Sequence, residues 1–336
     1  MDFHGRSAPI PRRWLCTAAA LVALACATAQ RDDARAAGDY PRQAVRIIVP
    51  YGPGGAGDLT IRLIAERLSQ NLKQPFVVEN RPGAGGIAAM RSVLSAPADG
   101  YTLGEMGNGQ TIGVSLFQSL PYNILTDFTQ ISVAARFAML LVVPPNSPYK
   151  SVNDVIDAAR KAPGKLNLGA INPGSTQNLS AHLFQQVSGA QFTLVTYRTT
   201  PDLVTALLRG DVHLGFDYFA GLESTIAPDK LHVIATSGEE RDPLFKDIPT
   251  VKESGLPDYA VTSWNGVGAR ASVPPEIITT LSGEIRRALA APDVRERMLR
   301  LGLEAHGSTP EEMRSQMVAD IAKWRRVIET AGIPKQ

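Results

Sequence analysis

The stretch VRIIVPYGPGGAGDL, residues 45–59, decides how the rest of the chain is interpreted. Residues 45–49 form a β-branched apolar run that predicts a buried strand, and the glycines that follow do not suit a helix or strand interior. Beyond them, apolar residues recur with helical spacing at Ile61, Ile64, Ala65, Leu68 and Leu72. A strand therefore ends, a glycine loop crosses over, and a helix begins. The unpaired N–H groups at the start of that helix attract anions.

Two specific interpretations of this corner compete with that of a plain turn. Gly52, Gly54 and Gly57 satisfy the G-x-G-x-x-G spacing of a dinucleotide site, and Glu79 follows where such a site keeps its ribose-binding acid. The rival is a solute-binding corner, in which backbone amides hold a small carboxylate. The stretch by itself leaves all three alternatives open.

The N-terminus has the pattern of a secretory signal peptide. Arg12 and Arg13 precede an apolar run of mostly small residues that ends in an A-x-A site at residues 27–29. We predict a cleavable signal peptide over residues 1–37 and export to the periplasm. Both cysteines, Cys16 and Cys26, lie in this segment, so the mature protein would have no disulfide, thiolate metal site or thiol nucleophile.

The rest of the chain alternates strand-like and helix-like segments, which predicts an α/β fold with largely parallel sheets. Strands are expected at residues 45–49, 75–79, 101–104, 131–133, 139–143, 166–170, 192–197, 212–216, 231–235 and 261–267. Ser151 and Thr309 have the pattern of helix caps, and long helices are expected over 275–290 and from 310 to about 330. Polar loops follow most strands, and the double proline at 144–145 is a plausible crossover between domains. We predict one discontinuous lobe, residues 38–142 plus 259–336, and a second lobe, residues 143–258, with a ligand cleft between them.

Recognisable catalytic patterns are missing from the sequence. The histidines after the signal lack metal-ligand spacing, no G-x-S-x-G elbow occurs, and the glycine corner lacks the Gly-Lys-Ser/Thr ending of a P-loop. A net charge of +2 without a basic run gives no reason to expect a nucleic-acid partner. We therefore predict binding without chemistry, with no catalytic residue, no metal and no cofactor. The alternative is an exported nicotinamide-dependent oxidoreductase that uses Gly52, Gly54 and Gly57. It is weakened because Glu79 runs directly into a second glycine loop.

Motifs spread along the chain resemble one known family. They are YGPGGAGD at 51–58, ENRPGAGG at 79–86, DGYTL at 99–103, LPY at 120–122, PGKLN at 163–167, FD at 216–217, DIPTV at 247–251 and GLP at 255–257. In this order and spacing they resemble Bug-type receptors, the periplasmic solute-binding components of tripartite tricarboxylate transporters. The resemblance implies a two-lobed periplasmic binding protein fold, type II-like, that closes on one small carboxylate, either an organic acid or an acidic amino acid. It also implies membrane permease subunits, or a sensor, as partners. We take the protein to be a monomer.

The resemblance also implies which residues contact the ligand. They are Tyr51, Gly54, Gly55, Asp58, Ala84, Gly85, Asn108, Thr111, Ser175, Thr176, Asn178, Tyr197 and Asp217. Each side chain among them has a structural alternative, such as helix capping for the acids and core packing for the tyrosines. We expect Asp58→Ala to weaken ligand binding with little loss of stability. Tyr218 and Asn178 depart from the common family pattern and leave the identity of the ligand open.

Overall fold

The first strand and helix of the computed structural model form where the periodicity predicts them. The structure describes residues 40–171, 175–227 and 229–336, so the predicted signal peptide lies outside the described residues. Strand β1 (Val45–Val49) is buried except for Arg46. Helix α2 (Ala56–Leu72) buries one apolar face that includes Ile61, Ile64 and Leu68. The glycine-rich residues between them therefore bring the start of α2 to the carboxyl end of β1.

Strand β1 lies in the middle of a parallel group, between β2 (Phe76–Asn80) and β3 (Thr102–Gly107). Beyond β3 lies β9 (Thr262–Arg270), which runs antiparallel. The parallel strands are connected through the 3₁₀ turn η1 (Ala84–Gly86) and the helices α2 and α3 (Ile87–Ser95). Parallel connections bring the starts of the following helices to one edge of the sheet, which is where α/β proteins bind ligands.

A second parallel group consists of β6 (Thr193–Tyr197), β5 (Asn167–Ile171) and β7 (Leu214–Tyr218), in this order. Its helices are α5 (Val152–Lys161), α6 (Thr176–Ser188), α7 (Thr200–Arg209) and the short α8 (Phe219–Leu222), which continues into a 3₁₀ turn, η2 (Glu223–Thr225). Helix α5 begins at Ser151, whose hydroxyl accepts a hydrogen bond from the amide of Asp154, as the capping pattern predicts. Both groups thus repeat the strand–loop–helix unit of the opening stretch.

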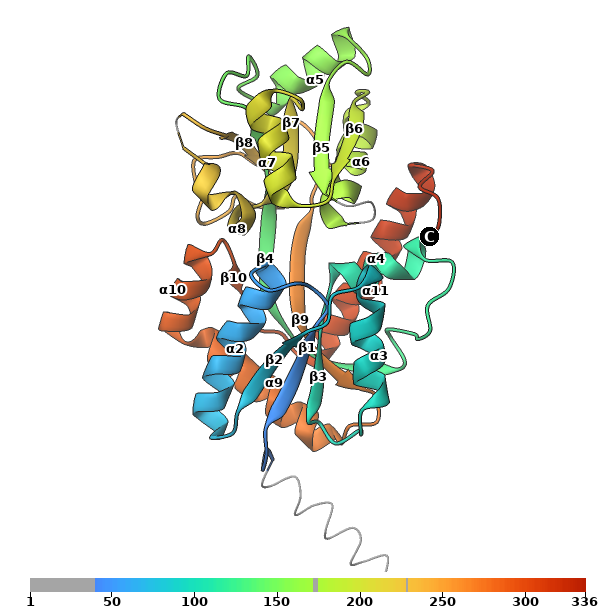
Figure 1. Ribbon diagram of the computed structural model, residues 1–336, viewed down its shortest axis with the longest axis vertical. Helices are drawn as coiled ribbons and strands as arrows, with labels where there is room; N and C mark the ends of the chain where they lie inside the picture. The colour runs from blue at the N-terminus through green and yellow to red at the C-terminus, as the bar shows by residue number, and fades with distance from the viewer. Residues whose placement is uncertain (1–39, 172–174, 228) are drawn as a thin grey trace, which may run out of the picture. The chain divides into compact units, whose positions relative to one another are not determined.

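A single long strand joins the two groups, and this corrects one prediction. We expected two strands, 131–133 and 139–143, but β4 (Phe128–Val143) is continuous over 16 residues. Its first part pairs with β9 and β10 (Glu304–Ala305), and its last part pairs with β7 and β8 (His232–Thr236). Figure 1 shows β4 and β9 running from one group of strands to the other. Pairing on both sides holds the less apolar middle of β4 in the strand.

Helices cover both faces of the first group. Met106 of β3 packs with residues of α3 and α11 (Pro310–Thr330), while α2 contacts α9 (Pro275–Ala290). Strand side chains alternate between the two faces of a sheet, so the Glu105 side chain lies on the face opposite to Met106. Gly107 belongs to the same face as Glu105. The predicted helices 275–290 and 310–330 are confirmed. Two further helices of the described chain are α4 (Asn108–Leu116) and α10 (Pro292–Arg300).

Residues 43–336 form one compact unit, so the predicted lobe boundaries near 142 and 259 stay a prediction. They fall at the end of β4 and just before β9, the two strands that Figure 1 shows running between the groups. Within the described ranges, no helix combines the length and the low polarity that a membrane crossing needs.

Candidate functional site

Three helices begin directly after parallel strands, and the predicted site residues gather around these starts. Helix α2 follows β1, α4 follows β3 and α6 follows β5. The residues Asn108 to Thr111, which we expected to form a loop, are the first turn of α4. The Gln110 side chain makes this possible, because its Oε1 accepts a 2.7 Å hydrogen bond from the amide of Gly107. Each helix start offers N–H groups that the helix itself cannot pair.

Asp58 lies in the first turn of α2 and is only 1% exposed. Its Oδ2 accepts hydrogen bonds from the Gly54 amide at 2.9 Å and from Arg62 Nε at 2.8 Å, and its Oδ1 accepts one from Asn80 Nδ2 at 2.8 Å. Burial alone would raise the pKa of this carboxyl, but these donors hold it below its usual value. Through its hydrogen bond with the Gly54 amide, Asp58 therefore holds the glycine loop in place. Whether it also contacts a ligand stays a prediction.

The two glycine loops differ in what surrounds them. A Cβ on Gly54 or on Gly55 would have no atom of the described chain within 4 Å other than those of its sequence neighbours, so both positions face open space, and Gly54 has φ +89°. Gly85 has φ +58°, and a Cβ there would come within 2.2 Å of the Phe117 ring. Gly85 therefore serves packing between η1, which includes Ala84, and the end of α4. The first loop, which is open, suits ligand contact better than the second.

Tyr51 projects from the first loop and is 40% exposed. A Cβ on Gly57 would lie 3.1 Å from Tyr51 Cδ2, and one on Gly109 would lie 2.8 Å from Tyr51 Oη. The ring therefore spans from the start of α2 to the start of α4. Although the residue as a whole is partly exposed, its phenol oxygen lies against Gly109, and burial there, followed by the charges of Glu105 and Tyr218, raises the pKa of the phenol well above the ordinary value. Tyr51 stays a neutral hydrogen-bonding group at physiological pH.

Asp217 ends the buried part of β7 and is also saturated by protein donors. It accepts hydrogen bonds from Thr200 Oγ1 at 2.6 Å, Gln177 Nε2 at 3.1 Å and the Tyr218 amide at 2.8 Å. Burial is the largest influence and raises the pKa of this carboxyl despite these donors. Asp217 connects the starts of α6 and α7 to the end of β7, and a contact with a ligand amine stays a prediction.

The remaining predicted side chains have identifiable structural roles. Asn108 Oδ1 accepts the Trp264 amide at 2.9 Å, and Thr111 Oγ1 donates to the Asn108 carbonyl at 2.9 Å. Ser175 caps α6 by accepting the Asn178 amide at 3.1 Å. Thr176 and Asn178 are buried in the first turn of α6. Tyr197 packs against the apolar cluster of α7 and β5. These roles are compatible with ligand contact, which stays a prediction.

Four residues that the sequence reasoning did not select lie beside the predicted ones. Tyr218 and Ser263 share a 2.7 Å hydrogen bond between their hydroxyls, which joins β7 to β9. Burial raises the pKa of Tyr218 to about 12, and hydrogen bonds from Ser263 and Thr176 only partly offset it. Asn265 lies two residues beyond Ser263 and pairs with Gly107 of β3, and Glu105 lies two residues before Gly107. In the pleated sheet these side chains share one face.

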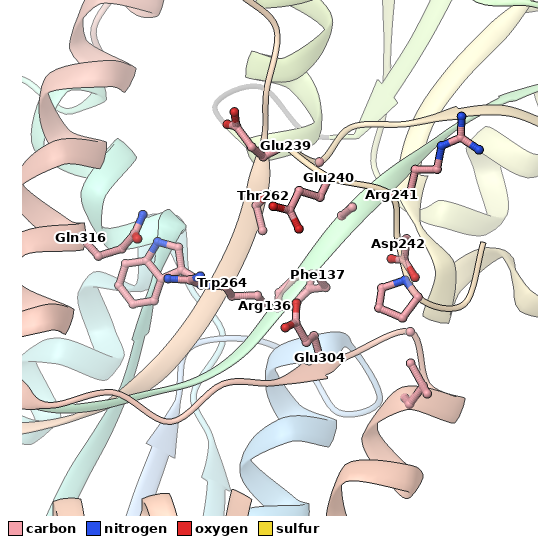
Figure 2. Close-up of a pocket in the computed structure, with 15 residues that line it drawn as sticks. Arg136, Phe137, Glu239, Glu240, Arg241, Asp242, Thr262, Trp264, Glu304 and Gln316 are labelled. Carbon is pink, nitrogen blue, oxygen red and sulfur yellow. The ribbon is translucent and has the colours of Figure 1, made fainter. Parts of the chain in front are cut away.

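A separate cavity is lined in part by residues of β4 and β9. It has a volume of about 470 Å³, and its lining includes Arg136, Glu240, Asp242, Trp264 and Glu304. Figure 2 shows side chains of both charge signs around it. It contains none of the predicted ligand residues. Acidic side chains oppose a carboxylate ligand, so this cavity suits an organic acid less well than the helix starts do.

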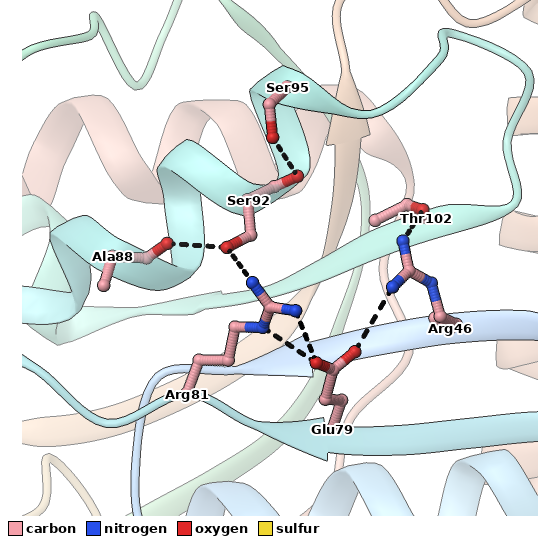
Figure 3. A network of polar contacts seen from close by, with 7 residues as sticks. All are labelled: Arg46, Glu79, Arg81, Ala88, Ser92, Ser95 and Thr102. Carbon is pink, nitrogen blue, oxygen red and sulfur yellow. Dashed lines mark hydrogen bonds and ion pairs between the residues drawn. The ribbon is translucent and has the colours of Figure 1, made fainter.

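Glu79 does not have the surroundings of a ribose-binding acid. Its carboxylate pairs with Arg46 at 3.4 Å and with Arg81 at 2.6 Å, and Arg81 also donates to Ser92 of α3 (Figure 3). The strand order also differs from that of a Rossmann sheet, because β1 lies between β2 and β3 and the next strand, β9, is antiparallel. Both observations count against the dinucleotide interpretation.

Metal binding has no support within the part of the chain that the structure describes. No group of three or more His, Cys, Asp or Glu side chains is placed there to hold a metal ion. The groups available at the helix starts are backbone amides, hydroxyls, several side-chain amides and the carboxyl of Glu105.

Comparison with known proteins identifies one matching family and several similar proteins. The family model described as "tripartite tricarboxylate transporter family receptor" matches residues 60–333. Protein BugT of Bordetella pertussis is 30% identical, over 93% of this chain and 97% of that protein. Among solved structures, the R. palustris protein Rpa4515 with adipate has a TM-score of 0.79 and 35% identity, and covers 88% of this chain and 100% of its own. MatC of Rhodopseudomonas palustris with bound malate has a TM-score of 0.74 and 29% identity, and covers 86% and 100%.

Proposed function

The chain belongs to the receptor family of tripartite tricarboxylate transporters, and on this premise we propose that it captures a small organic acid by its carboxylate groups. Members of this family are solute-binding receptors with the fold of periplasmic binding proteins. The similar structures with adipate and malate support a dicarboxylate as the ligand class.

One observation carries the proposal: the starts of α2 and α4 meet beside an open glycine loop. Tyr51 spans both starts, and Gly54 and Gly55 face open space there. Helix starts combine unpaired N–H groups with the positive end of the helix dipole, which suits a carboxylate without any arginine. Tyr51, the loop at Gly54 and Gly55, and the first turns of α4 and α6 are the ligand contacts we propose.

We propose further that capture involves closure of two lobes, residues 38–142 plus 259–336 against residues 143–258, about β4 and β9. The receptor would be exported by its signal peptide, act in the periplasm as a monomer, and deliver its ligand to permease subunits in the membrane. No chemistry is assigned to it. The surroundings of Glu79 disfavour the oxidoreductase alternative.

A thermal-shift screen tests the proposal. The purified protein is melted with adipate, malate, acidic amino acids or NAD, because a ligand that binds only the folded state raises the melting temperature. A rise with one class of carboxylates is expected, followed by a dissociation constant from titration calorimetry. A rise with NAD alone would overturn the receptor assignment.

A further inference from the structure

Glu105 is a buried acid without a partner at the point where the ligand is proposed to bind. It is 1% exposed, and its Oε2 has no hydrogen-bond partner among the described residues. Its Oε1 lies 3.5 Å from the position of a Cβ on Gly57 and equally far from that on Gly107. The carboxyl therefore lies between the starts of α2 and α4.

Asn265, on the neighbouring strand β9, is also buried with polar atoms that are unpaired among the described residues. It is 2% exposed, and neither its Nδ2 nor its Oδ1 has a partner in the described part of the chain. It pairs with Gly107 across β3 and β9, so its side chain emerges on the same face as Glu105. Buried polar atoms in folded proteins are nearly always hydrogen-bonded, and exceptions call for an explanation such as a bound molecule.

These observations point to one ligand chemistry. Resting on the proposed function, we propose that Glu105 in its neutral form donates a hydrogen bond to a carboxylate of the bound acid, and that the Asn265 amide supplies a second donor. The ligand oxygens would then satisfy atoms that the protein leaves unpaired. The two residues set the specificity for a carboxylate at this position.

The charge state of Glu105 follows from its surroundings. Burial raises the pKa of its carboxyl to about 8, and no charged side chain of the described residues adds to this shift. Asp58 and Arg62 of α2 are paired with each other, and the buried positions of α9 are apolar except for Ser282. Tyr51 faces Glu105 from the first loop and stays neutral. No cation of the described chain is available to hold Glu105 as an anion, so it carries its proton at neutral pH.

The proton gives the proposal a measurable consequence. An ionised Glu105 would repel a ligand carboxylate, so above its pKa the protein must first take up one proton to bind. Affinity then falls by up to about tenfold for each pH unit above the pKa of Glu105. The phenol of Tyr51 does not interfere, because its pKa lies well above the ordinary value.

Titration calorimetry with adipate and with malate tests the proposal, at about pH 6.5 and about pH 9.5. Wild type is expected to lose about tenfold or more in affinity at the higher pH. Glu105→Gln, which donates at every pH, keeps its affinity within about threefold across this range, and Glu105→Leu binds at least about tenfold more weakly at the lower pH. Asn265→Ala weakens binding at both pH values but retains the pH dependence.

The outcomes separate this inference from the proposed function. If wild type binds an acid and Glu105→Leu binds it with the same affinity and pH profile, Glu105 has no such role and the receptor assignment stands. If Glu105→Gln loses affinity at the higher pH as steeply as wild type does, the pH dependence does not come from Glu105 and the proposal is overturned. If wild type binds no carboxylate at either pH, the proposed function itself fails. Circular dichroism checks that each variant is folded.

Discussion

Asp58 and Glu105 are both buried acids, each 1% exposed, and both lie where α2 begins against the sheet. Asp58 accepts hydrogen bonds from three protein donors, whereas Glu105 Oε2 accepts none from any described residue. Burial acts to raise the pKa of both carboxyls, but only that of Glu105 is raised, to about 8, because the donors of Asp58 lower its pKa. A buried acid with satisfied oxygens maintains the loop; one without partners costs stability and remains available to a ligand.

The largest expected effect is the loss of stability in Asp58→Ala. The substitution removes the acceptor of the Gly54 amide and one acceptor each of Arg62 and Asn80, so we expect the free energy of unfolding to fall by about 2–3 kcal/mol in urea denaturation. This replaces our expectation from the sequence that Asp58→Ala has little effect on stability. Asp154→Ala is the matched control, because Asp154 holds the same position in α5 but is exposed, and it should cost clearly less stability than Asp58→Ala. Equal losses of stability in both variants would show that the burial of Asp58 adds nothing to its contribution.

We expect an effect of intermediate size in how Glu105 makes the stability of the protein depend on pH. The pKa of Glu105 in the folded chain, about 8, lies above its ordinary value of 4.5. The folded state therefore binds more protons than the unfolded state between these values, and stability falls as pH rises through this window. Comparing wild type with Glu105→Gln from about pH 5 to about pH 8.5 isolates this contribution. The wild-type free energy of unfolding should decline more steeply, and parallel profiles would show that Glu105 is not a buried neutral acid.

The smallest effect is expected for Glu79, a third acid at this end of the sheet. It is partly exposed and pairs with Arg46 and Arg81, so Glu79→Ala should cost less than about 1 kcal/mol. Affinity for carboxylates should not change, because the Glu79 carboxylate pairs with Arg46 and Arg81 and not with the proposed ligand contacts. Titration with NAD provides the opposite check: measurable binding to wild type that is lost in Glu79→Ala would restore the dinucleotide interpretation.

Much of the secondary structure could be predicted from local patterns. The caps at Ser151 and Thr309 and the helices 275–290 and 310–330 are confirmed, because capping and helical periodicity depend on residues within a few positions of one another. The motifs also indicated the receptor family. The ends of strands were less predictable: we expected the third strand to end at Gly104, and so missed that Glu105 lies inside the fully buried β3. A glutamate in such a strand was the signal that could have identified it.

The sequence by itself determined the α/β class, the strand–loop–helix corner at residues 45–72 and the capped helices, since each depends on spacing within a short segment. Only the tertiary structure decided that β4 is one continuous strand shared by two groups, because the pairing with β9 and β7 comes from segments far along the chain. The same holds for Glu105 and Asn265, which are 160 positions apart (265 − 105) and meet on one face through the register of β3 and β9. Strand register is a long-range property, and no local pattern encodes which distant residues it brings together.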